Sequence, residues 1–169
     1  MNAKVEEGLN QQILKEEYSS RLYLAMAIWC EVNGYPGVAA FLYGHSEEER
    51  MHMMKLVRFV NDRGGKTKLF NVDVPPLNYD SVLDIFTQIR EHEVYITDSI
   101  NKLYGLTVEE HDYTTGNFLQ WYINEQIEEE SLVNNVIDKI KLAGTDKAGL
   151  FHIDKELEGM AAPVNLPKE

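Results

Sequence analysis

Carboxylates and a histidine, residue types that bind metal ions, interrupt the apolar stripes of this sequence near their middle. In four long segments, apolar residues recur at alternating steps of three and four, as along one face of a helix. Near the middle of these stripes stand Glu16, Glu49, His52, Glu93 and Glu129, and Gln126 lies beside the stripe that carries Glu125 and Glu129. Carboxylates buried without counter-charge would cost several kcal/mol each, whereas two divalent cations would neutralise four glutamates. The pattern therefore predicts a buried site for two metal ions.

The donor types narrow the choice of metal. Glu49 and His52 are three residues apart, which places a carboxylate and an imidazole one turn apart on one helix face. Oxygen-rich ligation with a single imidazole suits iron or manganese, and it is poor for copper(I) or structural zinc. A lone Glu-x-x-His is a weak signal. Together with carboxylates at the same level of three other helices, it becomes a specific one.

Simpler interpretations exist for the individual residues. The acidic runs 47–49 and 128–130 are each compatible with a solvated helix face, and His52 alone would suit a hydrogen-bonded core position. One glutamate of each run lies on its helix's apolar stripe, which favours the ligand interpretation. Tyr23 is expected to pack in the core, with a hydrogen bond to a ligand or one-electron donation as its second role. The other histidines are expected to be structural or exposed: His45, His92, His111 and His152.

The apolar spacing predicts an all-α fold that positions these residues. Helices are expected at about 4–33, 37–63, 81–104 and 107–142, with a shorter one at about 146–158 and a loose tail at 159–169. Gly64-Gly65 is typical of a helix C-cap, and Thr107 to Glu110 has the spacing of a capping box. The link 64–81 is long enough, at roughly 60 Å extended, to run the length of a helix of about 40 Å. We therefore expect a single domain, 1–169, built as a four-helix bundle with one long crossover and a short fifth C-terminal helix.

Composition excludes several classes of protein. The 169 residues carry a net charge of −12, which argues against nucleic-acid or anionic-membrane partners and suits a protein that handles cations. The single cysteine, Cys30, cannot form an internal disulfide. The longest nearly apolar run, Leu22 to Cys30, is far shorter than the roughly 20 residues of a membrane-spanning helix. The first residues lack the layout of a signal peptide, so a cytoplasmic location is expected.

Several motifs together resemble one known family. They are Glu16-Glu17-Tyr18-Ser19-Ser20, His45-Ser46-Glu47-Glu48-Glu49-Arg50-Met51-His52, His92-Glu93, Asn117 to Tyr122, Glu125 to Glu130 and Phe151 to Leu157. Over nearly its full length the chain resembles the ferritins, and most closely the bacterial non-haem ferritins. The resemblance implies an iron-storage ferroxidase with a ferritin-like bundle, which assembles into a homo-oligomeric shell of about 24 subunits. Its fifth helix would help to line four-fold channels.

The resemblance also implies where iron is bound. The first iron would take Glu16, Glu49 and His52, and the second would take Glu49, Glu93 and Glu129, with Gln126 close by. A third, weaker iron site would comprise Glu48, Glu125 and Glu128, and Tyr23 would stand next to the centre. The di-iron ligands and Tyr23 would together form the catalytic site.

Two departures separate this chain from related families. Bacterioferritins carry their haem-ligating methionine directly after the first motif's glutamate, where this chain has Arg50, so no haem is expected. Many di-iron oxidases have a second Glu-x-x-His on the fourth helix, but Gln126 and Glu129 leave the second metal without an imidazole. One cysteine also cannot build the four-thiolate iron site of a rubrerythrin.

Three functions follow from these patterns. The first is ferroxidase-driven iron storage, in which Fe(II) is oxidised by oxygen or peroxide and deposited as ferric mineral inside the shell. The alternative is a di-iron oxidoreductase that reduces peroxide or oxygen without storing mineral. The third is a metal-free structural bundle with protonated or hydrated carboxylates. Glu109, Glu110 and Asp112 are candidate residues for an iron-access channel, although acids near a helix N-terminus also complement its dipole.

Overall fold

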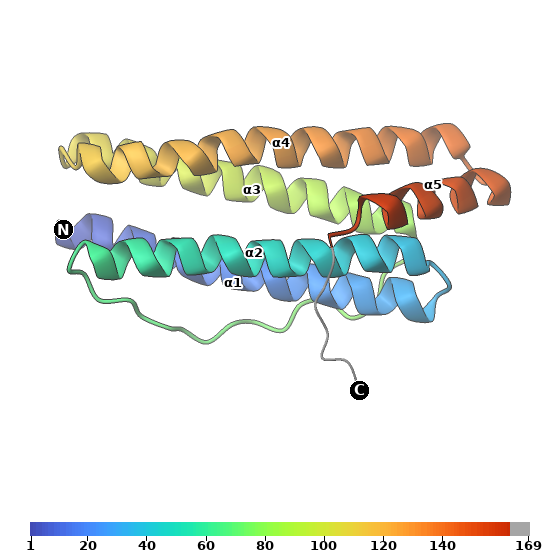
Figure 1. The fold of residues 1–169 in the computed structure, drawn as a ribbon, viewed down its shortest axis with the longest axis horizontal. Coiled ribbons are helices and arrows are strands. Elements are labelled where there is room, and N and C mark those ends of the chain that lie inside the picture. The colour runs from blue at the N-terminus through green and yellow to red at the C-terminus, as the bar shows by residue number, and fades with distance from the viewer. Residues whose placement is uncertain (163–169) are drawn as a thin grey trace.

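Five helices and one long connection make up the protein, for which the computed structural model describes residues 1–162. The helices are α1 (Ala3–Val32), α2 (Pro36–Asp62), α3 (Val82–Glu109), α4 (Tyr113–Ala143) and α5 (Lys147–Met160). In Figure 1, α1 and α2 run antiparallel side by side, as do α3 and α4. The connection after α2 passes along the outside of the bundle and leads into α3, which runs parallel to α2. This confirms the predicted bundle with one long crossover.

Local sequence explains most of the helix ends. The side chains of Asn2, Ser81 and Asp146 accept hydrogen bonds from backbone N–H groups in the first turns of α1, α3 and α5, as N-cap residues do. After α2, Gly64 adopts a φ of 72° and Gly65 donates its N–H to the carbonyl of Val60. That pair of features is a glycine C-cap, and the prediction at Gly64-Gly65 is confirmed.

The predicted boundary between the third and fourth helices is wrong. Thr107 does not open a helix: it lies inside α3, where its hydroxyl donates to the carbonyl of Tyr104. The chain turns later, at His111, which has a φ of 55°. Asp112 then accepts a hydrogen bond from the Thr115 N–H and caps α4. The spacing of a capping box was present at Thr107, but burial of that residue keeps it in the preceding helix.

The C-terminal part of the chain also differs slightly from expectation. Gly159 and Met160, assigned to the tail by sequence, still belong to α5. The remainder of the predicted tail lies largely outside the described residues, which end at 162. None of the described helices combines the length and apolar character that crossing a membrane would require.

The hydrophobic core is divided in two along the bundle. One cluster fills the end that carries α5, and it includes Met26, Leu42, Phe86 and Ile137. The other fills the opposite end, and it includes Leu9, Leu56, Ile100 and Leu119. Between them lies a band of buried polar side chains contributed by all four long helices, here called the polar band. Its members include Glu16, Glu49, His52, Glu93, Gln126 and Glu129. The two apolar clusters, one on each side of the band, therefore hold the four helices together and keep the polar side chains out of bulk water.

The fifth helix is held at the bundle by a buried carboxylate. Asp154 of α5 accepts hydrogen bonds from the backbone N–H groups of Gly37 and Val38, each at 2.9 Å. These are first-turn donors of α2, whose own N-cap residue, Tyr35, makes no side-chain cap. A carboxylate at this helix start is also favoured by the helix dipole. The close approach requires glycine at position 37, where a Cβ would lie 1.9 Å from the Asp154 carbonyl oxygen.

Candidate metal centre

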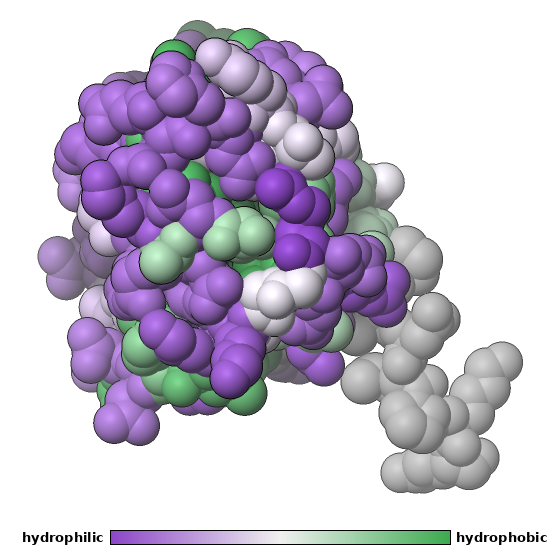
Figure 2. All heavy atoms as spheres, turned by 90° about the vertical axis from the view of Figure 1, so that its left-hand side faces the viewer, coloured by the Kyte–Doolittle hydropathy of each residue, from purple (hydrophilic) through white to green (hydrophobic). Residues whose placement is uncertain are grey.

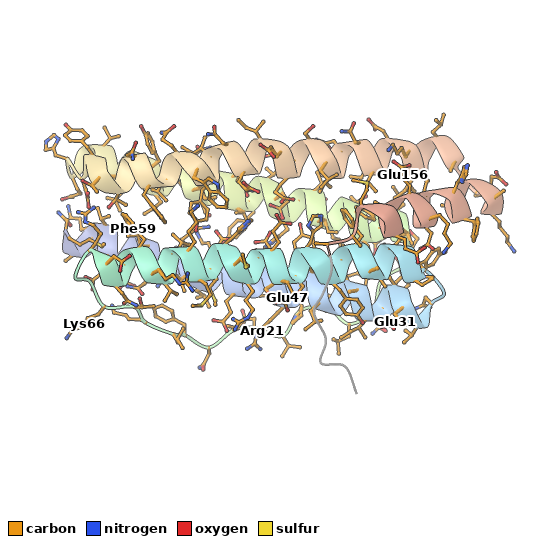
Figure 3. The ribbon with its side chains drawn as sticks, in the orientation of Figure 1. Arg21, Glu31, Glu47, Phe59, Lys66 and Glu156 are labelled. Atoms are coloured by element: carbon orange, nitrogen blue, oxygen red, sulfur yellow. The ribbon has the colours of Figure 1, made fainter. Side chains whose placement is uncertain are left out.

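The polar band holds every residue that the sequence predicted for a di-iron centre. The residues come from α1 (Glu16), α2 (Glu49, His52), α3 (Glu93) and α4 (Gln126, Glu129). Each is buried, with 1–6% of its surface exposed. The acidic runs divide as expected, because Glu47 lies on the solvent side of α2 (Figure 3) while Glu49 faces inward. Helical phase, read from the apolar stripe, predicted the burial of Glu16, Glu49, His52, Glu93 and Glu129 correctly, and Gln126, expected beside its stripe, is buried as well.

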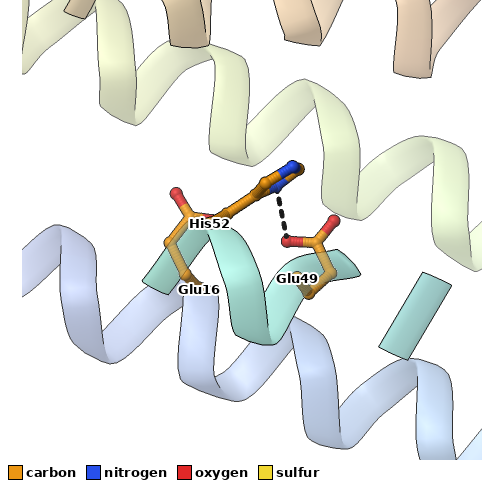
Figure 4. Close-up of side chains that lie close together, drawn as sticks. All are labelled: Glu16, Glu49 and His52. Carbon is orange, nitrogen blue, oxygen red and sulfur yellow. Dashed lines mark ion pairs between the residues drawn. The ribbon is translucent and has the colours of Figure 1, made fainter. Parts of the chain in front are cut away.

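Three of these residues already form a ligand set. One atom each of Glu16, Glu49 and His52 lies within 4.8 Å of the other two. In Figure 4 the His52 ring points to the Glu49 carboxylate, with Nδ1 3.5 Å from Oε2, and Glu16 of α1 lies on the other side of His52 in this view. Two carboxylates and an imidazole within this distance of one another match the donor set that iron and manganese accept.

Glu93 forms hydrogen bonds with neighbouring side chains and does not join this group. Its Oε1 accepts a hydrogen bond of 2.6 Å from the Tyr23 hydroxyl, and its Oε2 accepts one of 2.9 Å from Gln126 Nε2. Among residues 1–162, Glu93 joins no group of three ligand atoms within 4.8 Å. The second predicted ligand set is therefore not gathered round one point, although its members line the same band. Tyr23 packs in the apolar core, as expected, and its hydroxyl also donates a hydrogen bond to a predicted ligand.

Burial without counter-charge raises the pKa of three carboxyls in the band. Desolvation is the main cause for Glu16 and Glu49, whose pKa values lie well above the ordinary range, and repulsion between neighbouring carboxylates adds to it. Desolvation likewise raises the pKa of Glu129 to about 7. Within the described chain, no lysine or arginine forms an ion pair with any of them. Divalent cations would supply the missing positive charge, so the residues present fit a metal pair.

The predicted third site is assembled only in part. Glu48 and Glu125 each bring an oxygen within 4.8 Å of a common partner, which is His52. Glu128 is exposed and joins no such group among the described residues. A further group, missed by the sequence interpretation, combines Glu48 with His45 and Glu129. His45 is half-buried, and its Nδ1 lies 3.0 Å from Glu48 Oε2.

Sequence reasoning also missed the residues that orient the ligands. Gln12 Nε2 donates to Glu16 Oε1 at 2.7 Å, and the Oε1 of Gln12 accepts from the Ser99 hydroxyl at 2.8 Å. Gln126 also contacts the Thr97 hydroxyl, which donates to Glu130 at 2.6 Å. Gln12 precedes Glu16 by four residues and so shares its helix face. That spacing of four residues could have predicted the contact between Gln12 and Glu16 from the sequence.

The acidic residues proposed for iron access have other partners. Glu110 accepts hydrogen bonds from Asn2 and Lys4, and Asp112 pairs with Arg63 while capping α4. They lie at the end of the bundle seen in Figure 2, whose surface is mostly hydrophilic. These contacts account for Glu110 and Asp112 structurally, and an access role stays a prediction.

Comparison with known protein families and structures identifies relatives of this chain. The family model of the ferritin-like domain matches residues 6–143. The bacterial non-haem ferritin of Campylobacter jejuni is 42% identical over 161 residues, covering 95% of this chain and 96% of the relative. That of Escherichia coli O6:H1 is 44% identical over 151 residues, covering 89% and 92%. A structure of the open pore ferritin of the archaeon Archaeoglobus fulgidus superposes with a TM-score of 0.93 at 42% identity, covering 94% and 98%. With the five-helix fold of residues 1–162, a buried group of carboxylates and an imidazole that could hold a metal ion, and these relatives, the chain belongs to the ferritin family, among the bacterial non-haem ferritins.

Proposed function

We propose that this protein oxidises ferrous iron in the polar band and stores the ferric product as mineral inside a hollow shell of identical subunits. The observation that carries the proposal is the meeting of Glu16, Glu49 and His52, three buried ligands from two helices with no ion-pair partner from lysine or arginine among the described residues. Such a set is stable when a cation enters and costly when it stays empty and charged.

Two ferrous ions are the substrate of this reaction. Glu16, Glu49 and His52 would bind the first, and Glu49 would bridge to a second that Glu93 and Glu129 hold, with Gln126 beside it. Each Fe(II) gives one electron to the oxidant. A dioxygen that takes two electrons and two protons leaves as hydrogen peroxide, and a peroxide that takes two more of each leaves as water. A pair of ions suits this chemistry, because both electrons are available at one place.

The ligand sets differ in a way that favours release of the product. The carboxylates of both positions are buried, but the first position has an imidazole, whereas the second lacks a histidine of its own. Ferric iron would leave the second position more readily and move towards Glu48, Glu125 and Glu128, of which Glu48 and Glu125 are half-buried. These residues form our proposed third site. Tyr23, through its hydrogen bond, holds Glu93 in one orientation.

Assembly and location complete the proposal. Ferritins form oligomeric shells, and we propose 24 copies of this 19.4 kDa chain, with α5 near the four-fold channels. A shell provides the enclosed acidic surface on which ferric mineral can grow. We place the protein in the cytoplasm, where reducing conditions keep thiols such as the buried Cys30 free and keep iron in the ferrous state.

The test is the amount of iron retained per chain after aerobic addition of a large excess of Fe(II). Storage predicts soluble iron far beyond the about two or three ions that the ligand sets can hold, eluting together with a large particle. Glu49→Gln should oxidise iron much more slowly, and Glu47→Gln, an exposed neighbour in the same run, should behave as wild type. A plateau at about two or three ions would favour the di-iron oxidoreductase without storage. No retained iron would overturn both.

A further inference from the structure

A pocket of about 290 Å³ opens between α3 and α4 beside the polar band, and none of the steps proposed above uses it. Its walls include three isoleucines and three polar side chains: Ile100, Ile123, Ile127, Thr97, Gln126 and Glu130. Ile127 is 66% exposed, whereas Ile100 and Gln126 are buried, with 1% and 5% exposed. The pocket therefore leads from the protein surface to the edge of the polar band.

The inner end of the pocket lies next to a predicted iron ligand. Gln126, which lines the pocket, donates a hydrogen bond from its Nε2 to Glu93 Oε2 at 2.9 Å. Thr97, on the opposite wall, follows Glu93 by about one turn of α3. A small molecule at the inner end would thus be separated from the second predicted iron position by the Gln126 side chain alone.

The polar side chains of the pocket are already paired with one another. The Thr97 hydroxyl donates a hydrogen bond of 2.6 Å to Glu130 Oε1 and accepts one of 3.2 Å from Gln126 Nε2. The three isoleucines form the rest of this lining and make no hydrogen bond. Because apolar surface is more stable against an apolar partner than against water, the pocket favours a small apolar occupant.

A ferrous ion fits this pocket poorly. Glu130 is the one lining residue among residues 1–162 that can carry a charge, and one of its oxygens already accepts from Thr97. In the same part of the chain, Glu130 joins no group of three histidine, cysteine or acidic ligand atoms within 4.8 Å. Cations are held where several carboxylates and an imidazole meet. The pocket therefore suits the uncharged reactant of the proposed reaction and not the ion.

We propose that the pocket between α3 and α4 binds dioxygen and delivers it to the iron pair from the side of Gln126 and Glu93. Dioxygen is small, uncharged and apolar, so it loses no hydrogen bond on leaving water for the isoleucine walls. The inference rests on the proposed function, in which dioxygen takes one electron from each of two Fe(II) ions and two protons, and leaves as hydrogen peroxide. The oxidant would then reach the centre without competing for the carboxylates that bind the ions.

Crystals pressurised with xenon test the pocket directly. Xenon is apolar, enters cavities lined by aliphatic side chains and scatters anomalously. Wild-type protein should show a xenon peak among Ile100, Ile123 and Ile127. Ile127→Trp places a larger ring at the exposed end of the pocket, where the fold tolerates it, and should lose the peak. Ile127→Ala leaves the pocket open and should keep it.

The dependence of Fe(II) oxidation on dioxygen concentration gives the matching measurement in solution. Ile127→Trp should raise the KM for dioxygen severalfold and leave the rate at saturating dioxygen nearly unchanged, because the iron ligands are intact. The control, Val94→Trp, adds the same ring at a position of α3 that is 52% exposed and does not line the pocket. It should keep the wild-type KM. Both variants should bind Zn²⁺ in the metal-free protein as tightly as wild type does.

Wild-type crystals decide the question even if a variant fails to fold. No xenon peak in the pocket, including the case in which a neighbouring subunit fills it, would overturn this inference. An unchanged KM for dioxygen in Ile127→Trp would do the same, as would a variant that slows oxidation by hydrogen peroxide and not by dioxygen. Failure of the wild type to oxidise Fe(II) with either oxidant would instead count against the proposed function itself.

Discussion

At the scale of single residues, the carboxylates of the polar band are governed by burial without counter-charge. Repulsion from Glu49 adds to the cost of a negative charge on Glu16, and repulsion from Glu93 and Glu129 adds to the cost of one on Glu49. Hydrogen-bond donors offset part of that cost at Glu16 and Glu93, through Gln12, Tyr23 and Gln126. Donors that hold a ligand without binding the ion themselves fix its orientation. The band is therefore prepared for cations and least stable when it is both empty and ionised.

The raised pKa of Glu129 predicts how the stability of the metal-free protein depends on pH. Its pKa is about 7 in the fold against an ordinary value of 4.5, so the folded chain binds more protons than the unfolded chain between these pH values. The free energy of unfolding should therefore fall as pH rises through this range, by at most about 3 kcal/mol for this group. Urea unfolding at pH 5 and pH 8 measures the change. Glu129→Gln should reduce it, whereas exposed Glu128→Gln should leave it as in wild type.

Loss of the Gln12 hydrogen bond should weaken the first metal position. In Gln12→Leu the Glu16 carboxylate loses the donor that orients it, so the affinity for Zn²⁺ should fall by about 10–100-fold. Calorimetric titration of the metal-free protein measures this affinity. Gln11→Leu changes an exposed neighbour that bonds only to Glu7 within the described chain and should bind Zn²⁺ as wild type does. Equal affinities in the two variants would show that Gln12 does not act on the site.

At the scale of elements, the contacts between helices keep the site residues of α1 and α2 at the same level as those of α3 and α4. The apolar clusters on both sides of the band pack all four long helices. The Phe59 and Phe118 rings stack at 3.7 Å between α2 and α4 near one end, and α5 closes the other end against α2. A displaced helix would carry its ligand with it. The site therefore depends on packing far from the metal.

Two glycine-to-alanine substitutions separate packing from helix propensity. At Gly37 a Cβ would overlap the Asp154 backbone, so Gly37→Ala should displace α5 and destabilise the protein by about 1–3 kcal/mol. Gly105 lies in α3 with open space around its Cβ position, so Gly105→Ala should stabilise it by about 0.5–1 kcal/mol. Denaturant unfolding measures both effects. Hydrogen exchange should show faster exchange of α5 amides in Gly37→Ala alone.

At the scale of the whole molecule, the outer face of α1 suggests a contact between subunits. Leu24, Ile28 and Val32 are spaced by four residues and lie exposed along one stripe. The crossover carries further exposed apolar residues at Leu69, Val74 and Leu77. A shell of identical chains would bury such surfaces. The same assembly would enclose the volume in which mineral grows, so storage depends on contacts that a single bundle lacks.

Placing a charge on that face should disrupt assembly. Ile28 is 50% exposed in the single chain, so Ile28→Asp should fold but sediment as smaller species, because a carboxylate would have to be desolvated at the contact. Ile28→Val keeps the apolar character and should sediment like wild type. Sedimentation velocity of both variants at equal concentration checks this. If Ile28→Asp assembled fully, this stripe would not be a subunit contact.

Helical periodicity in the sequence determined which side chains face the core, because residues three and four apart share one face whatever surrounds them. It therefore placed Glu16, Glu49, His52, Glu93 and Glu129 inside a bundle, and the length of the link 64–81 predicted the topology of that bundle. Charge balance determined that the centre needs cations. These properties depend only on the order of residues along each helix.

The tertiary structure decided which inward-facing groups meet. Glu48 approaches His45 and His52 and not Glu128, Glu93 turns to Tyr23 and Gln126, and burial keeps Thr107 inside α3. Side-chain rotamers and the relative rotation and offset of packed helices fix such contacts. Neither is encoded in the spacing of a single helix, because they arise only when all four helices pack together.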